Sequence, residues 1–327
     1  MTDFTYAVDG DGVATITWDV AGKSMNVMST AAFALLSDLV DRGLADTGVK
    51  GIILTSGKKD FAGGMDLNVI AQMRAGGAQA IFDGVIQMHG VLRKIERAGM
   101  DPKTQKGGKP IVAALPGTAL GIGFELPLAC HRIIAADNPK AKIGLPEIMV
   151  GIFPGAGGTT RLARKLGAMM AAPFLLEGKL SDPKGAKAAG LIDEVVAPDQ
   201  LLARAKEWVL GAADADLIAM SIDVMRSLGF RQGDFVVRLS DRNVWPDFLE
   251  KAGVAAEHLS VFLQIIDKME REKPEVSAGR LAELGTSREA VDAFIAGRGA
   301  DWPPLQALLE NLAARGLSGF IKVDLGI

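Results

Sequence analysis

The hydrophobic and polar positions follow two patterns, and the change comes about two-thirds of the way along the chain. In residues 1–212, short apolar β-prone runs alternate with longer stretches of helical periodicity. Two alternating runs joined by glycines, Phe4–Val8 and Val13–Trp18, predict a hairpin. The runs at 51–55 and 111–115 are almost entirely apolar, which is typical of buried strands. Strands that alternate with helices place this part in the α/β class.

From residue 213 to residue 327 the pattern is mostly helical, and the composition changes near Asp214. The sequence therefore predicts two domains, 1–212 and 213–327. On either side of the boundary we expect separate helices at 201–210 and 217–228, and in the tail short strands at 235–239 and 319–323.

Composition narrows the class of protein. Of 327 residues, 49% are hydrophobic and the formal net charge is −3, so we expect a soluble globular chain with no affinity for nucleic acid. Cys130 is the only cysteine, which excludes an internal disulfide and suits a cytoplasmic location. The three histidines make no metal-ligand pattern, and no run suggests a signal peptide or a membrane span.

A glycine-punctuated turn with a carboxylate just beyond it follows the run at 111–115. Phe124–Cys130 is apolar nearly throughout and predicts the start of a buried helix. The first N–H groups of a helix have no internal partner, so an N–H near Ile122 could face an oxygen that becomes negative during a reaction. Glu125 lies in this first turn. The alternative is tight helix–strand packing with Glu125 as a capping charge.

A second carboxylate, Glu147, follows Leu145 and Pro146 at a spacing of 22 residues from Glu125. This spacing leaves room for a helix and a returning strand. Burying an unpaired carboxylate costs several kcal/mol. Two carboxylates brought together would raise the pKa of one of them, as acid–base chemistry on a water molecule requires.

A second glycine turn, at 56–66, leads into a helical pattern that starts at Leu67. Alone it indicates a capped loop. Paired with the turn near Ile122, it could place N–H groups on two sides of one oxygen, as in an oxyanion hole. No Walker motif is present, and Gly155-Ala-Gly157 lacks the third glycine of a dinucleotide fingerprint.

Four motifs occur in a fixed order along the first part of the chain. They are Phe61-Ala-Gly-Gly-Met-Asp66, Leu120-Gly-Ile-Gly-Phe-Glu125, Ile143-Gly-Leu-Pro-Glu147 and Phe153-Pro-Gly-Ala-Gly-Gly-Thr-Thr-Arg161. Together they resemble the enoyl-CoA hydratase (crotonase) family, and most closely the hydratase domain that opens multifunctional fatty-acid β-oxidation proteins. The resemblance covers about residues 1–210.

The resemblance implies a crotonase-like spiral of ββα units and the hydration of 2-enoyl-CoA thioesters. It implies that the backbone N–H groups of Met65 and Ile122 bind the thioester oxygen, and that Glu125 and Glu147 hold the water. No separate cofactor is implied, because coenzyme A is part of the substrate. A homo-oligomer or a β-oxidation complex is the implied assembly.

The resemblance also places further residues along the path of the CoA and acyl groups; these are Ser24, Asn26, Gly63, Asp66 and Leu67. Ile122 departs from the family, which usually has glycine there. Isoleucine disfavours positive φ and fills space, so acyl-chain room and donor angle are open questions. Two alternatives remain, an enoyl-CoA isomerase of the same fold and a catalytically inactive scaffold.

The tail resembles an internal piece of histidyl-tRNA synthetase in four short stretches, of which Phe235–Arg242 and Phe320–Gly326 are the longest. The ATP-binding motif and the tyrosine-containing histidine-binding motif of that enzyme are absent, and Tyr6 is the only tyrosine in the chain. We therefore expect residues 213–327 to have no activity of their own.

Overall fold

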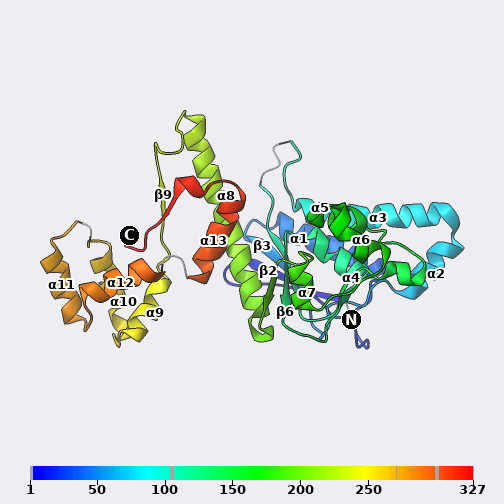
Figure 1. The fold of residues 1–327 in the computed structure, drawn as a ribbon, viewed down its shortest axis with the longest axis horizontal. Coiled ribbons are helices and arrows are strands. Elements are labelled where there is room, and N and C mark those ends of the chain that lie inside the picture. The colour runs from blue at the N-terminus through cyan, green and yellow to red at the C-terminus, as the bar shows by residue number, and fades with distance from the viewer. Residues whose placement is uncertain (1–2, 104–106, 270, 299–301, 327) are drawn as a thin grey trace. The chain divides into compact units, whose positions relative to one another are not determined.

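The chain divides into two compact units, Met1–Ala213 and Asp214–Ile327 (Figure 1). The computed structural model describes residues 3–103, 107–269, 271–298 and 302–326. Each unit has a hydrophobic core of its own.

The first unit is built around a six-stranded sheet in the order β1-β2-β3-β4-β6-β8. β1 and β2 form the predicted antiparallel hairpin, and the other neighbouring strands pair in parallel. The strands are Phe4–Val8 (β1), Val13–Trp18 (β2), Gly51–Ser56 (β3), Ile111–Leu115 (β4), Arg132–Ala136 (β6) and Glu194–Val196 (β8). A second, two-stranded parallel sheet pairs Ala119–Leu120 (β5) with Ile143–Gly144 (β7).

Helices cover both faces of the large sheet, which explains why its central strands are apolar throughout. Successive side chains of a strand point to opposite faces. Ile52 and Leu54 of β3 belong to the core under α1, whereas Ile53 packs in a separate cluster with Trp208 of α8. The helices are Thr30–Ala45 (α1), Leu67–Ala75 (α2), Gly77–Arg97 (α3), Ile122–Glu125 (α4), Gly158–Leu166 (α5), Ala168–Leu176 (α6), Pro183–Ala188 (α7) and Leu201–Ser227 (α8).

The buried helix predicted from Phe124 is much shorter than expected. It is the single turn α4, followed by the 3-10 turn Pro127–Ala129. Proline has no N–H and its ring obstructs the preceding turn, so Pro127 stops the α-helix. The segment is nevertheless buried, as the sequence predicted.

The two helices predicted at 201–210 and 217–228 are one helix, α8. The prediction of a break was wrong because the connecting residues 211–216, Gly-Ala-Ala-Asp-Ala-Asp, include three alanines. Alanine has the highest helix propensity, and one glycine costs a helix only about 1 kcal/mol.

The second unit is mostly helical with two short strands, as predicted. The strands Val237–Leu239 (β9) and Ile321–Val323 (β10) pair in parallel. Trp245, Phe248, Phe262 and Phe294 form an aromatic centre with ring centroids 4.9–5.7 Å apart. The helices are Val244–Lys251 (α9), Leu259–Ile266 (α10), Pro274–Glu283 (α11), Arg288–Arg298 (α12) and Pro303–Ala314 (α13).

Candidate active site

The turn that leads into α4 lies against the turn that precedes α2. Leu120 N–H donates to the Ala62 carbonyl at 3.0 Å, and Gly121 N–H donates to the Gly144 carbonyl at 3.2 Å. Gly121 has φ +56°, a left-handed conformation that glycine adopts at little cost. These hydrogen bonds fix the position at which α4 begins, and therefore the position of Glu125 in that helix.

Glu125 is buried, with 3% of its surface exposed. Its Oε1 accepts a hydrogen bond from the Gly158 N–H at 2.7 Å. Burial raises the pKa of Glu125 to about 7, and the charge of Glu147 adds to this rise; the N–H groups of Gly158 and Ala156 and the Arg161 charge oppose it. A carboxyl with a pKa near 7 is suited to exchange protons at neutral pH.

Glu147 stands at the Leu145-Pro146 corner and begins the 3-10 turn Glu147–Val150. It is 9% exposed, and its Oε2 is buried without a hydrogen-bond partner in the part of the chain that the structure describes. Burial raises the pKa of Glu147 to about 7, against the opposing effect of its own N–H. A β-carbon at Gly121 would lie 3.3 Å from Glu147 Oε1, so this carboxyl borders the same turn.

Met65 lies opposite Met28 in a parallel pairing of two extended segments. Met28 forms hydrogen bonds with the two residues that flank Met65. Met28 N–H donates to the Gly64 carbonyl, and Asp66 N–H donates to the Met28 carbonyl, each at 2.9 Å. Because backbone groups alternate in direction along an extended chain, the Met65 N–H points away from Met28. It has no hydrogen-bond partner among the described residues.

Ile122 is the first residue of α4, so its N–H has no partner within the helix, and none elsewhere in the described chain. The strain anticipated at this isoleucine is absent, because the positive φ falls on Gly121 and, of the described non-glycine residues, only Ala98 has positive φ. The Ile122 side chain is 3% exposed and packs in the core of the first unit.

Truncating Ile122 to alanine is therefore expected to lower the free energy of unfolding by roughly 2–5 kcal/mol, the usual cost of emptying a core position. The N–H survives the change, so activity should persist at temperatures where the variant stays folded. Urea unfolding and a rate measurement on the same sample check this. A variant that is as stable as the wild type but inactive would contradict the prediction, because the side chain would then contribute to activity and not to the core.

Asn26 was predicted on the substrate path, but its side chain is used within the protein. It is fully buried; its Oδ1 accepts from Val20 N–H at 2.9 Å, and its Nδ2 donates to the Trp18 and Phe61 carbonyls and to Ser56 Oγ at 2.9–3.0 Å. Asn26 thus ties the chain before it to the turn that precedes Met65. A buried side-chain amide needs such hydrogen bonds, because no water is available to replace them.

The other predicted path residues differ in accessibility. Ser24 and Gly63 are exposed, and Asp66 is half-buried with its Oδ1 accepting from Asn68 N–H at 2.9 Å. Leu67 begins α2, and its side chain lies outside the described part. Substrate contacts of these four residues stay predictions.

Residues that the sequence did not assign also contribute. Ala156, in the glycine loop before α5, and Gly158, the first residue of α5, direct N–H groups at Glu125. A β-carbon at Gly158 would lie 2.9 Å from Glu125 Oε1, so only glycine fits there without displacement. The Gly157-Gly158 pair was the available signal, because paired glycines often mark a close approach of backbone to another group.

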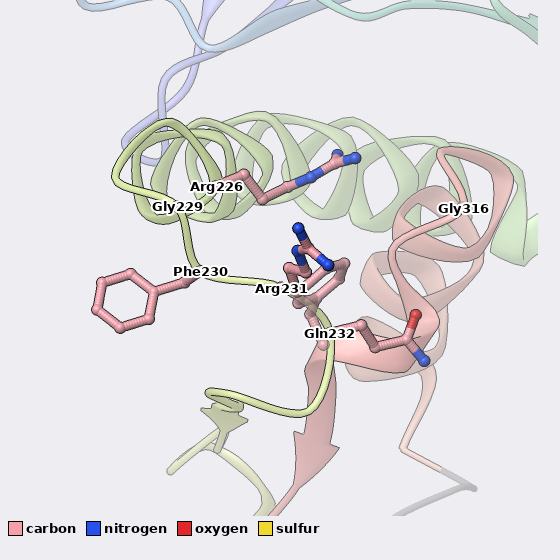
Figure 2. A pocket seen from close by; sticks show the side chains of 7 residues that line it. Arg226, Gly229, Phe230, Arg231, Gln232 and Gly316 are labelled. Carbon is pink, nitrogen blue, oxygen red and sulfur yellow. The ribbon is translucent and has the colours of Figure 1, made fainter.

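Within the described chain no group of three or more acidic, histidine or cysteine side chains could hold a metal ion, and no helix is long and apolar enough to cross a membrane. The second unit has an open hollow of about 540 Å³ (Figure 2). Arg226 and Arg231 direct their guanidinium groups toward it, and its described lining residues include neither an acid nor a histidine. It therefore offers no acid–base pair of the kind found in the first unit.

Comparisons with known proteins agree on one family. The model of the family described as enoyl-CoA hydratase/isomerase matches residues 9–227. This match continues past residue 212, the predicted domain boundary, and ends with α8.

Two curated relatives are both called fatty acid oxidation complex subunit alpha. The one from Shewanella sp. (strain MR-4) is 32% identical over 285 residues, which cover 86% of this chain and 38% of the relative. The one from Shewanella halifaxensis (strain HAW-EB4) is 39% identical over 202 residues, which cover 61% of this chain and 27% of the relative. The chain thus spans well under half the length of these relatives.

A solved structure of an enoyl-CoA hydratase from Bacillus anthracis superimposes with a TM-score of 0.54 at 27% identity. The superposition covers 69% of this chain and 87% of that chain.

Proposed function

Because the chain belongs to the enoyl-CoA hydratase/isomerase family, whose fold it shares, we propose that it is an enoyl-CoA hydratase that adds water across the C2=C3 bond of 2-enoyl-CoA thioesters. The observation that carries the proposal is the pair of buried carboxyls, Glu125 and Glu147, which both adjoin the turn at Gly121. Hydration needs one group to take a proton from water and one to deliver a proton to C2, and two carboxyls with pKa values near 7 supply both.

The surroundings of the two carboxyls support different roles for them. Glu125 accepts a hydrogen bond from the Gly158 N–H, and the nearby Ala156 N–H also lowers its pKa, so both groups favour its ionised form. Glu147 has a buried oxygen without a donor, which favours its neutral form. We therefore take Glu125 as the base that removes a proton from the attacking water, and Glu147 as the acid that protonates C2.

The chemical difficulty lies in the charge that develops on the thioester oxygen as water attacks C3. The N–H groups of Met65 and Ile122 are the donors proposed for it, since both are free of other partners in the described chain. A fixed donor of this kind contributes roughly 3 kcal/mol to the stability of the transition state.

An isomerase of the same family is the nearest alternative, because moving a double bond requires only one carboxyl to carry a proton. The two carboxyls favour hydration. The deciding experiment follows the loss of 2-enoyl thioester absorbance with purified protein and, separately, the gain of that absorbance from a 3-enoyl-CoA. Activity with only the 3-enoyl substrate would identify an isomerase, and inactivity with both would indicate an inactive scaffold.

The rate of hydration should depend on pH with a maximum near neutrality. kcat/KM rises as Glu125 ionises and falls as Glu147 ionises, and burial raises the pKa of each to about 7. The two apparent pKa values belong to the pair and not to single residues. A profile that stays flat between about pH 5 and about pH 9 would contradict this assignment of acid and base.

The substrate and assembly follow from the same proposal. Coenzyme A enters as part of the acyl-CoA substrate, and no separate cofactor takes part. The relatives are subunits of a fatty acid oxidation complex by name, and we propose association with copies of this chain or with such a complex. Exposed apolar side chains near Glu147 support an interface, among them Met149, Phe153 and Met169 at 72–87% exposure. The cytoplasmic location and the synthetase-like tail stay predictions.

A further inference from the structure

Arg161 contacts the backbone of the glycine loop whose N–H groups face Glu125. It is in the first turn of α5, and its side chain is 11% exposed. Its Nη1 donates to the Ala156 carbonyl at 3.2 Å, and its Nη2 donates to Glu96 Oε2 at 3.3 Å. A guanidinium so enclosed has a fixed position, because its planar fork is pre-organised for these contacts.

The loop transmits this position to Glu125. Ala156 accepts from Arg161 through its carbonyl and faces Glu125 with its N–H, and Gly158 N–H donates to Glu125 Oε1 at 2.7 Å. Gly157, between them, has φ +104°, and a β-carbon there would lie 2.4 Å from Arg161 Nη1. The guanidinium therefore packs against the backbone whose other side binds the carboxylate.

The charge of Arg161 is only partly compensated. Its acidic partner Glu96 is shared with Arg93, at 2.7 Å. Arg161 Nε is buried without a hydrogen-bond partner among the described residues.

The remaining titratable groups that contact this cluster carry no negative charge. Burial raises the pKa of the Cys130 thiol to about 12, so it is neutral. His131 Nδ1 accepts from Ile111 N–H, and its Nε2 faces the Glu96 carbonyl. His89 Nε2 contacts the Gly155 carbonyl at 2.6 Å. The other acid that acts on Glu125 is Glu147, whose charge raises the Glu125 pKa when it ionises; the proposed function takes Glu147 as protonated while Glu125 is ionised.

We propose that Arg161 is a positioning residue for Glu125: it holds the loop 155–158 so that its N–H groups point at the carboxylate, and its positive charge keeps Glu125 the ionised member of the pair. This inference rests on the proposed hydratase function. A residue that only stabilises the fold would leave the pH dependence of kcat/KM unchanged when it is replaced, whereas replacing a positioning residue should shift it.

The test compares Arg161→Gln, Arg161→Lys and the control Arg164→Gln, which removes the same charge from an exposed position of the same helix. In Arg161→Gln the acidic limb of the kcat/KM profile should move to higher pH by up to about one unit, which lowers the rate on that limb by up to about tenfold. Arg161→Lys keeps the charge but loses the fork that contacts Ala156 and Glu96, so the limb should move less than in Arg161→Gln. Arg164→Gln should match the wild type.

A ¹³C NMR titration of the Glu125 carboxyl gives a readout that does not depend on activity. The Glu125 pKa should rise in Arg161→Gln and not in Arg164→Gln. An unchanged Glu125 pKa in folded Arg161→Gln would overturn the inference, as would equal shifts in both glutamine variants. If the wild type fails to hydrate any 2-enoyl-CoA while the titration behaves as expected, the proposed function fails and the positioning role stands.

Discussion

Glutamine in place of Glu125 or of Glu147 is expected to lower kcat for hydration by roughly 10²- to 10⁴-fold, the range that one positioned acid or base supplies. The amide has nearly the shape of the carboxyl but can neither take a proton from water nor deliver one to C2. Binding of an acyl-CoA should change little, because the proposed donors to the thioester oxygen are backbone groups of Met65 and Ile122. Steady-state rates and a separate measurement of ligand affinity check both expectations.

The pH dependence of stability distinguishes a loss of catalysis from a loss of folded protein in these two glutamine variants. Both carboxyls have a folded-state pKa of about 7, above the ordinary value of 4.5 for a glutamate. The folded chain therefore binds more protons than the unfolded chain between these values, and stability falls as pH rises through this window. Glutamine does not ionise, so above pH 7 each variant should unfold at a temperature equal to or higher than that of the wild type.

Glu177→Gln, at an exposed glutamate, is the matched control and should change neither rate nor stability. Near-normal hydration by both Glu125→Gln and Glu147→Gln would show that the acid–base pair lies elsewhere.

Local pattern was sufficient for the parts of the fold that depend on neighbouring residues. The hairpin at Phe4–Val8 and Val13–Trp18 follows from alternation, and Ser29 caps α1 by accepting from Ala32 N–H at 3.0 Å. The helix expected from Phe124 was too long because the effect of Pro127 was given too little weight. The break expected near Asp214 was placed by composition, although the alanines there continue the helix.

The candidate site was predictable where motifs carried it and not where distant segments meet. Glu125 and Glu147 were predicted from their turns and from the family resemblance, and the structure buries both. The contacts of Asn26 join it to residues up to 35 positions away, and those of Arg161 to residues up to 65 positions away. Pattern along the chain does not report such distances, so it indicated neither the internal contacts of Asn26 nor a role for Arg161.

Alanine at Gly123 is expected to reduce kcat by roughly 10²- to 10³-fold, about the loss of one oxyanion donor. Gly123 lies in the first turn of α4 and does not have a left-handed φ, so its backbone accepts alanine. Space does not. A β-carbon there would lie 2.6 Å from Ala62 Cβ and 3.0 Å from the Ala62 carbonyl oxygen. Carbon atoms in contact are about 3.5–4.0 Å apart, so the two turns must separate by about 1 Å.

That separation acts on the proposed donors, since Ala62 precedes Met65 in one turn and Gly123 follows Ile122 in the other. Gly90→Ala is the control: it lies in α3, and among the described residues no atom outside its own helix's backbone is within 4 Å of the added carbon, so activity should be unchanged. Rates, substrate affinity and melting temperature are compared for both variants. A folded Gly123→Ala protein with kcat within about twofold of wild type would place the oxyanion donors away from these turns. It would leave the assignment of Glu125 and Glu147 intact, because the rates of the glutamine variants test that assignment on their own.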